Sequence, residues 1–172
     1  MKEKKKAIML VEQLFEDLEL WYPVYRLREE NVEVFIAGPE AGQTYIGKHG
    51  VPAKSDISFN QLDSKTTDLV LIPGGWAPDK LRRDTRVLEF IESMYAHRKL
   101  IASICHAGWV LVSAKVIKGK KVTSTQGIRD DLTNAGATWL YEPVVVDIPH
   151  ISSRRPADLP IYAKTIITHL FP

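Results

Sequence analysis

Short apolar runs alternate with segments of helical periodicity along most of this chain. The runs at residues 7–11, 32–38, 68–75 and 100–104 are mostly apolar, as strands buried on both faces require. Between them, apolar residues recur every three or four positions, which is typical of amphipathic helices. This alternation predicts an α/β fold whose mostly parallel sheet carries helices on both faces. A length of 172 residues suits one domain that spans the whole chain, residues 1–172.

The periodicity also predicts particular elements. We expect a helix near residues 14–25, ended by Asn31, whose inward stripe is Leu14, Leu18, Trp21, Tyr22 and Tyr25. Asp84 is expected to cap a second helix, and an apolar stripe marks a last helix at residues 159–170. Residues 41–58 are rich in glycine and polar side chains and predict a small hairpin at the sheet edge. Further short strands are expected at residues 121–124, 138–140 and 143–147, and between them a helix at residues 128–135 that Gly136 ends.

Composition narrows the class of protein. The single cysteine, Cys105, excludes an internal disulfide, and with no signal-like segment this favours a cytoplasmic protein. A net charge of +2 is too small to indicate nucleic-acid binding, and the one basic cluster is the run MKEKKK at residues 1–6. No apolar run approaches the roughly 20 residues of a membrane-spanning helix. We find no metal-ligand spacing, P-loop or GxGxxG motif, so no metal or cofactor is expected.

Cys105 is the first candidate for chemistry. An apolar strand ends directly at it and a helix follows, which is the arrangement of a nucleophile elbow. A helix start also favours a thiolate. Free cysteines are nevertheless often buried structural residues, and the local pattern leaves both interpretations open. His106, the next residue, is either an acid–base group or a histidine satisfied by a nearby carbonyl.

Other candidates follow other strands. Glu16, in apolar company after the first strand, is either a protonated acid that donates to the sulfur or an exposed helix-start acid. Gly74 and Gly75 end the third strand and either offer amides to an oxyanion or form a simple turn. Asp79 lies where it can orient a histidine. The carboxyl ends of parallel strands meet at one sheet edge, so these groups can converge.

Taken together, the motifs resemble the ThiJ/PfpI superfamily, within it the PfpI (intracellular protease I-like) branch, which has a class I glutamine amidotransferase-like fold. The resemblance covers nearly the whole chain. It implies a flavodoxin-like three-layer sandwich with a small β-hairpin excursion. The matching segments are FEDLEL (15–20), GKHG (47–50), LIPGGWAPD (71–79), ASICHAGWVLVSA (102–114), KGKKVTS (118–124), IRDDLTNAGATW (128–139), EPVVVD (142–147) and SSRRPADLP (152–160).

The resemblance assigns roles to these residues. It implies that Cys105 is the nucleophile, that Glu16 hydrogen-bonds it, and that the amides of Gly75 and His106 form an oxyanion hole. It further implies dimers or hexamers in which Asp79 reaches a neighbouring subunit's histidine. Three departures stand out: Ala107-Gly108 replaces Gly-Pro, Asp79 replaces glutamate, and Trp76 makes the entrance to the substrate site more aromatic.

The implied function is that of a cysteine-dependent enzyme acting on carbonyls. Three substrate classes are open, namely peptides, methylglyoxal and early glycation adducts, and a small site with a carboxyl beside the thiol favours the small dicarbonyls. A glyoxalase or deglycase therefore ranks above a peptidase. The alternatives are a non-enzymatic redox or stress protein that works by oxidation of Cys105, and an inactive assembly module.

Overall fold

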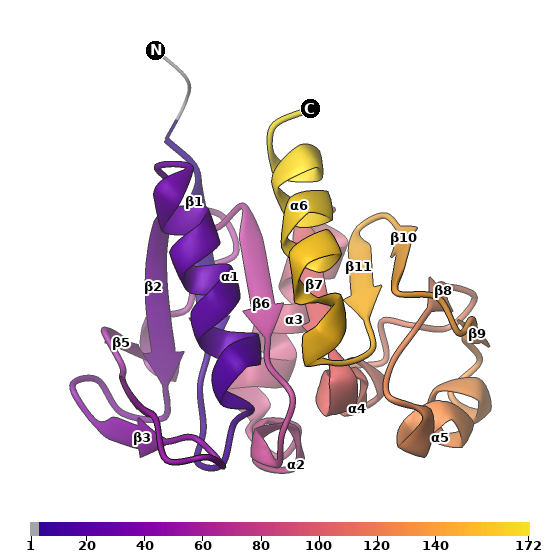
Figure 1. Cartoon of the computed structure of the whole chain (residues 1–172), viewed down its shortest axis with the longest axis horizontal. Coiled ribbons are helices and arrows are strands. Elements are labelled where there is room, and N and C mark those ends of the chain that lie inside the picture. The colour runs from indigo at the N-terminus through magenta and orange to yellow at the C-terminus, as the bar shows by residue number, and fades with distance from the viewer. Residues whose placement is uncertain (1–3) are drawn as a thin grey trace.

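The computed structural model describes residues 4–172, so the first three residues of the basic run at the N-terminus lie outside it. Its centre is a seven-stranded sheet with the strand order β10-β11-β7-β6-β1-β2-β5 (Figure 1). Every pair is parallel except β10 with β11. The strands are β1 (Lys6–Leu10), β2 (Glu33–Gly38), β5 (Ile57–Ser58), β6 (Leu69–Ile72), β7 (Leu100–Ile104), β10 (Val144–Asp147) and β11 (His150–Ser153). The predicted mostly parallel α/β sheet is confirmed.

Helices lie on both faces of this sheet. On one face α1 (Asp17–Glu29) and α6 (Leu159–Leu170) lie side by side (Figure 1). On the other, α3 (Thr85–Ala96) packs against β7 and α4 (Gly108–Ser113). The shorter α2 (Ala77–Leu81) and α5 (Arg129–Asn134) follow at the edge where the parallel strands end. None of the helices of residues 4–172 is long and apolar enough to cross a membrane.

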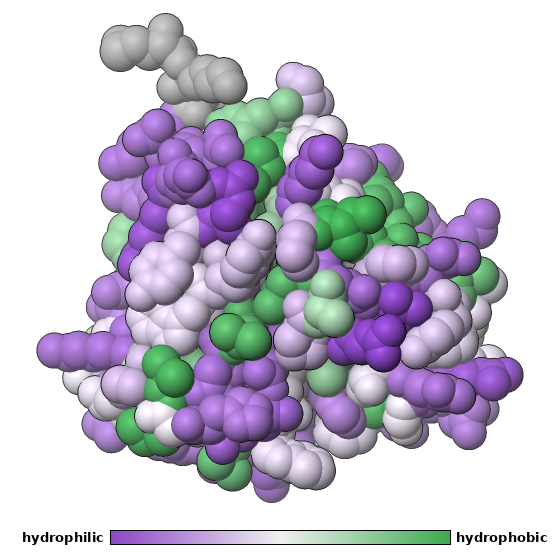
Figure 2. Space-filling view, viewed as in Figure 1, coloured by the Kyte–Doolittle hydropathy of each residue, from purple (hydrophilic) through white to green (hydrophobic). Residues whose placement is uncertain are grey.

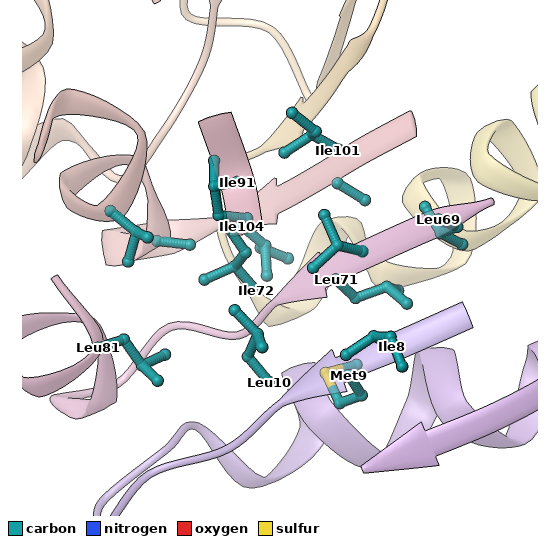
Figure 3. Packing of buried hydrophobic residues seen from close by; sticks show 14 of the residues in the cluster. Ile8, Met9, Leu10, Leu69, Leu71, Ile72, Leu81, Ile91, Ile101 and Ile104 are labelled. Carbon is teal, nitrogen blue, oxygen red and sulfur yellow. The ribbon is translucent and has the colours of Figure 1, made fainter. Parts of the chain in front are cut away.

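The core is built on the three central strands. Side chains of β1, β6 and β7, among them Leu10, Leu71 and Ile104, are almost completely buried and pack against one another and against the helices (Figure 3). Burying an aliphatic side chain of this size stabilises the fold by about 1.5–3 kcal/mol. The rigid strands therefore fix the positions of the loops that follow them.

The predicted inward stripe of the first helix is wrong at Leu14, Leu18 and Tyr25, whereas Trp21 and Tyr22 are half-buried and pack against the core. Leu20, Val24 and Leu27 face the core, whereas Leu18 and Tyr25 are 57% and 61% exposed. The helix begins only at Asp17, and the chain before it turns through a left-handed residue, Leu14. Two apolar stripes were available in this segment, and the sequence pattern did not show which of them the sheet would cover.

Several expected helix ends are confirmed. The Asp84 carboxylate accepts from the amide of Arg86 at 3.0 Å and caps α3. Asn31 and Gly136 follow their helices in left-handed conformations, as residues that end helices often do.

Residues 41–58 form the expected small hairpin. Its strands β3 (Thr44–Ile46) and β4 (Pro52–Lys54) pair with each other, and β5 then joins the edge of the main sheet. A second small sheet pairs β8 (Lys121–Val122) with β9 (Thr138–Trp139). Strand β11 does not follow from the sequence pattern, because its buried serines hide the apolar signal of a core strand.

Candidate active site

Cys105 occupies a strained turn at the end of β7. Its φ of +60° is a left-handed conformation, which costs a residue with a side chain about 1–2 kcal/mol. A single 3₁₀ turn, Cys105–Ala107, leads into α4. The sulfur is thereby presented at the carboxyl edge of the sheet, and the predicted nucleophile-elbow position is confirmed.

Gly74 and Gly75 bring the backbone of the neighbouring loop against this cysteine. Gly75 has a φ of +74° and forms a β-bridge with Phe15. A side chain at Gly74 would place its Cβ 2.6 Å from the Cβ of Cys105. Only glycine permits so close an approach.

The carboxyl group beside the sulfur belongs to Glu19. Its Oε2 accepts from the Gly74 amide at 2.8 Å, and its Oε1 is buried without a hydrogen-bond partner in the described part of the chain. Burial raises the pKa of Glu19 to about 8, and the nearby Glu16 charge adds to the rise. Glu19 is therefore mostly protonated at pH 7.

The expected contact between Glu16 and the thiol is wrong. Glu16 precedes the first residue of α1, and its Oε2 lies 2.7 Å from Lys48 Nζ and 3.6 Å from His49 Nε2. Glu19 lies three residues further on, on a similar face of the helix, where its carboxyl reaches the Gly74 amide. A sequence signal for Glu19 was its spacing, four residues before Pro23 and eight before Leu27, which puts the three on one face of the helix. The structure buries all three.

The environment of the sulfur opposes ionisation more than the sequence suggested. Burial, followed by the charge of Glu19, raises the pKa of the Cys105 thiol to about 12, while the amides of His106 and Gly75 lower it. The expected lowering of the thiol pKa at the helix start is outweighed by this burial. Where Glu19 is protonated, its share of the rise is absent.

His106 is placed to take the thiol proton. Its Nδ1 lies 3.3 Å from the sulfur, and burial lowers the pKa of the imidazole, which is therefore neutral at pH 7. Trp76 stacks on this ring at 6.2 Å between centroids, and Trp109 lies tilted against it at 5.1 Å. Trp109 is held by a 2.8 Å hydrogen bond to Asp131. Trp76 is 59% exposed at the entrance to the site, where the sequence placed it. Trp109 was not among the residues that the sequence predicted for the site.

Asp79 does not join the other candidates within this chain. It lies on α2, its side chain is 56% exposed, and its carboxylate pairs with Arg83 at 2.8 Å. Glu19, Gly75, Cys105 and His106, by contrast, come together at the ends of β6 and β7 and the start of α1.

A group of potential metal ligands, Glu16, Asp17 and His49, lies next to this site. Their ligand atoms all fall within 4.8 Å of one another. Glu16, however, already pairs with the Lys48 ammonium, and both Asp17 oxygens accept backbone amides, at 2.9 and 2.8 Å. A lysine cation on the shared carboxylate opposes a metal ion, so the arrangement fits a metal poorly.

Comparison with known proteins agrees with this geometry. The sequence profile of the DJ-1/PfpI family matches residues 5–169. The chain belongs to the DJ-1/PfpI family. It is 42% identical over 162 residues to a deglycase of Pyrococcus horikoshii, covering 94% of this chain and 97% of the relative.

Two further relatives place the family match in context. General stress protein 18 of Bacillus subtilis is 35% identical over 162 residues, covering 93% of this chain and 94% of that protein. The crystal structure of Drosophila melanogaster DJ-1beta superposes with a TM-score of 0.92 at 28% identity, covering 98% of this chain and 91% of that one. The DJ-1-like fold therefore extends over essentially the whole chain.

Proposed function

We propose that this protein is a cysteine-dependent enzyme that acts on reactive carbonyls as a glyoxalase and deglycase. The observation that carries the proposal is the contact of one thiol, Cys105, with a neutral imidazole at 3.3 Å and with the protonated carboxyl of Glu19. The deglycase name of the Pyrococcus horikoshii relative supports the same substrate class.

The first step is addition of the sulfur to an aldehyde carbon of a 2-oxoaldehyde such as methylglyoxal. The new C–S bond pushes the carbonyl π pair onto oxygen, and the amides of Gly75 and His106 are the donors available to that oxygen. His106 takes the thiol proton and passes it to the oxygen, which gives a hemithioacetal. Because the transfer accompanies the attack, no free thiolate has to accumulate.

The second step converts the hemithioacetal into product. The carbon bonded to sulfur loses its proton while the adjacent ketone oxygen gains one, which gives an enediol. The hydroxyl on the sulfur-bearing carbon then loses its proton as the adjacent carbon gains one, which gives a thioester of the 2-hydroxy acid. Water then cleaves the thioester, so that a 2-oxoaldehyde plus water gives a 2-hydroxy acid and the free thiol. Glu19 and His106 are the two groups at the sulfur that can carry these protons.

The same site accommodates a glycated amine. The sulfur attacks the hemiaminal carbon, the C–S bond forms as the C–N bond breaks, and the amine leaves with a proton from Glu19 or His106. The exposed Trp76 is proposed to contact the substrate at the entrance. Assembly into dimers or hexamers, with Asp79 serving a neighbouring subunit, is part of this proposal, as is a cytoplasmic location, whose reducing conditions keep the thiol free.

The test compares turnover of methylglyoxal, of a methylglyoxal-derived hemiaminal of N-acetyl-lysine, and of a peptide amide. The wild-type protein is expected to convert the first two into lactate, and Cys105→Ala is expected to abolish this. Full methylglyoxal turnover by Cys105→Ala would contradict the proposal. Faster cleavage of the peptide amide than of either carbonyl would instead favour the peptidase.

A redox role for Cys105 is the second candidate, and the protonated Glu19 carboxyl, which hydrogen-bonds the thiol, favours it. A protonated carboxyl there can donate to the oxygens of a sulfinate. Intact mass after mild peroxide treatment distinguishes the two roles. A stable gain of two oxygens on Cys105 in a protein without measurable turnover would support the redox role.

A further inference from the structure

Lys48 is a cation that faces the ionisable groups of the candidate site. Its ammonium lies 2.7 Å from Glu16 Oε2, and its side chain is 36% exposed. Its positive charge lowers the pKa of Cys105, of Glu19 and of His106. For the thiol and the carboxyl this favours the anion, and for the imidazole it favours the neutral base.

The backbone around Lys48 is fixed to the start of α1. The Lys48 amide donates to the carbonyl of Phe15 at 2.9 Å. The buried Asp17 carboxylate accepts from the amides of His49 at 2.9 Å and Val51 at 2.8 Å, and so holds the turn from both sides. A Cβ at Gly47 would collide with that carboxylate. The turn that carries Lys48 therefore has little freedom to move away from the site.

Glu16 holds the other end of the lysine. Its side chain is only 6% exposed, and its backbone amide donates to Gly74 at 3.1 Å, in the loop that approaches the sulfur. Exposed ion pairs contribute little to stability, but a buried carboxylate needs a partner. Glu16 thus restrains the ammonium beside the loop that faces Cys105.

We propose that Lys48 is an electrostatic positioning residue of the cysteine site, held there by Glu16 and Asp17. Its ammonium stabilises the negative charge that forms on the sulfur and then on the substrate oxygen. The part concerning the oxygen rests on the proposed function, whereas the part concerning the sulfur is independent of it. The titratable groups that face Lys48 are Glu16, Glu19, Cys105 and His106, and His49 contacts the same Glu16 carboxylate.

The experiment measures how fast iodoacetamide alkylates the protein between pH 6 and pH 10. The chain has one cysteine, so the rate reports on Cys105 alone. Lys48→Met is expected to lower the rate at pH 8 about 3- to 10-fold, a rise of about half to one unit in the thiol pKa. Lys48→Arg is expected to retain most of the wild-type rate.

Matched variants isolate the contribution of the Lys48 charge. Lys54→Met removes an exposed lysine from the same hairpin and is expected to match the wild-type profile. His49→Gln is expected to match it as well, which excludes titration of His49. If Lys48→Met folds poorly, as judged by its melting temperature, Lys48→Gln keeps a donor for Glu16 and carries the same test.

Profiles of Lys48→Met and wild type that superimpose would overturn the proposal. Methylglyoxal turnover is measured on the same samples. The acid limb of its pH profile is expected to move to higher pH in Lys48→Met, because the cation no longer lowers the pKa of His106. If the wild-type protein shows no turnover, the proposed function fails, and the alkylation profiles still decide the role of Lys48.

Discussion

At the residue scale, the fold keeps the Glu19 carboxyl protonated at neutral pH, and this lowers the free energy of unfolding. Its pKa is raised from 4.5 to about 8 because the carboxyl is removed from water. Between these two values the unfolded chain releases a proton that the folded chain keeps. The contribution of Glu19 to the free energy of unfolding is therefore highest below pH 4.5 and falls as the pH rises toward 8.

Glu19→Gln removes this pH dependence while keeping an oxygen for the Gly74 amide. At pH 7 the wild type has lost about 3 kcal/mol of its free energy of unfolding through Glu19, and the variant avoids this loss. The variant is therefore expected to melt several degrees above wild type. The difference should shrink toward pH 5, and turnover should fall because a proton carrier is lost. Thermal unfolding followed by circular dichroism from pH 4 to pH 9 checks the stability trend, and the methylglyoxal assay checks the loss of turnover.

Glu29→Gln is the matched control, since Glu29 lies on the same helix with its side chain 68% exposed. Its melting curve is expected to follow that of the wild type at every pH. A difference between Glu19→Gln and wild type that does not grow with pH would show that Glu19 is not held protonated.

At the element scale, the loop after β6 depends on backbone conformation at Gly75. A Cβ there would lie 2.5 Å from the Glu16 nitrogen and from the Leu14 oxygen, and both are backbone atoms that cannot swing away. Gly75→Ala is expected to lower the free energy of unfolding by about 2–4 kcal/mol. It should also reduce alkylation and turnover, because the amide facing the sulfur moves.

Gly42 provides a close control for this substitution. It has the same φ of +74° as Gly75, yet nothing lies within 4 Å of an added Cβ. Gly42→Ala should therefore cost only the left-handed conformation, about 1–2 kcal/mol, and leave turnover unchanged. Urea unfolding of both variants measures the difference. Equal losses would mean that the loop after β6 accommodates a side chain.

The arrangement of the elements explains which features could be predicted from the sequence and which could not. Apolar runs located the central strands, and Cys105 was placed correctly because its position depends on one strand end. The choice between Glu16 and Glu19 depends on where α1 begins, which the bridge from Phe15 to Gly75, 60 positions along the chain, helps to fix. Strand β11 escaped detection since its serines are satisfied by distant partners, such as Ser153 by the Pro143 carbonyl at 2.7 Å.

At the scale of the whole molecule, the surface of α1 leaves apolar groups uncovered. Pale and green residues lie over the lower half of α1 and the neighbouring hairpin in Figure 2. Leu18, Trp21, Tyr25, Val51 and Pro52, with Asp17, line a shallow hollow of about 360 Å³ there. Exposed apolar surface of this kind is typical of protein contacts. It is consistent with the proposed assembly of several copies.

Asp79 provides the sharpest test of that assembly, because within one chain it pairs only with the exposed Arg83 among the described residues. If Asp79 serves His106 of a neighbouring subunit, Asp79→Asn should lower turnover about tenfold or more. Co-expressing Asp79→Asn with Cys105→Ala under different tags should restore turnover in the purified mixed oligomer, since an intact Asp79 then faces an intact Cys105. Arg83→Gln should leave turnover unchanged. Turnover equal to the average of the two parent variants would show that Asp79 does not act on a neighbouring subunit.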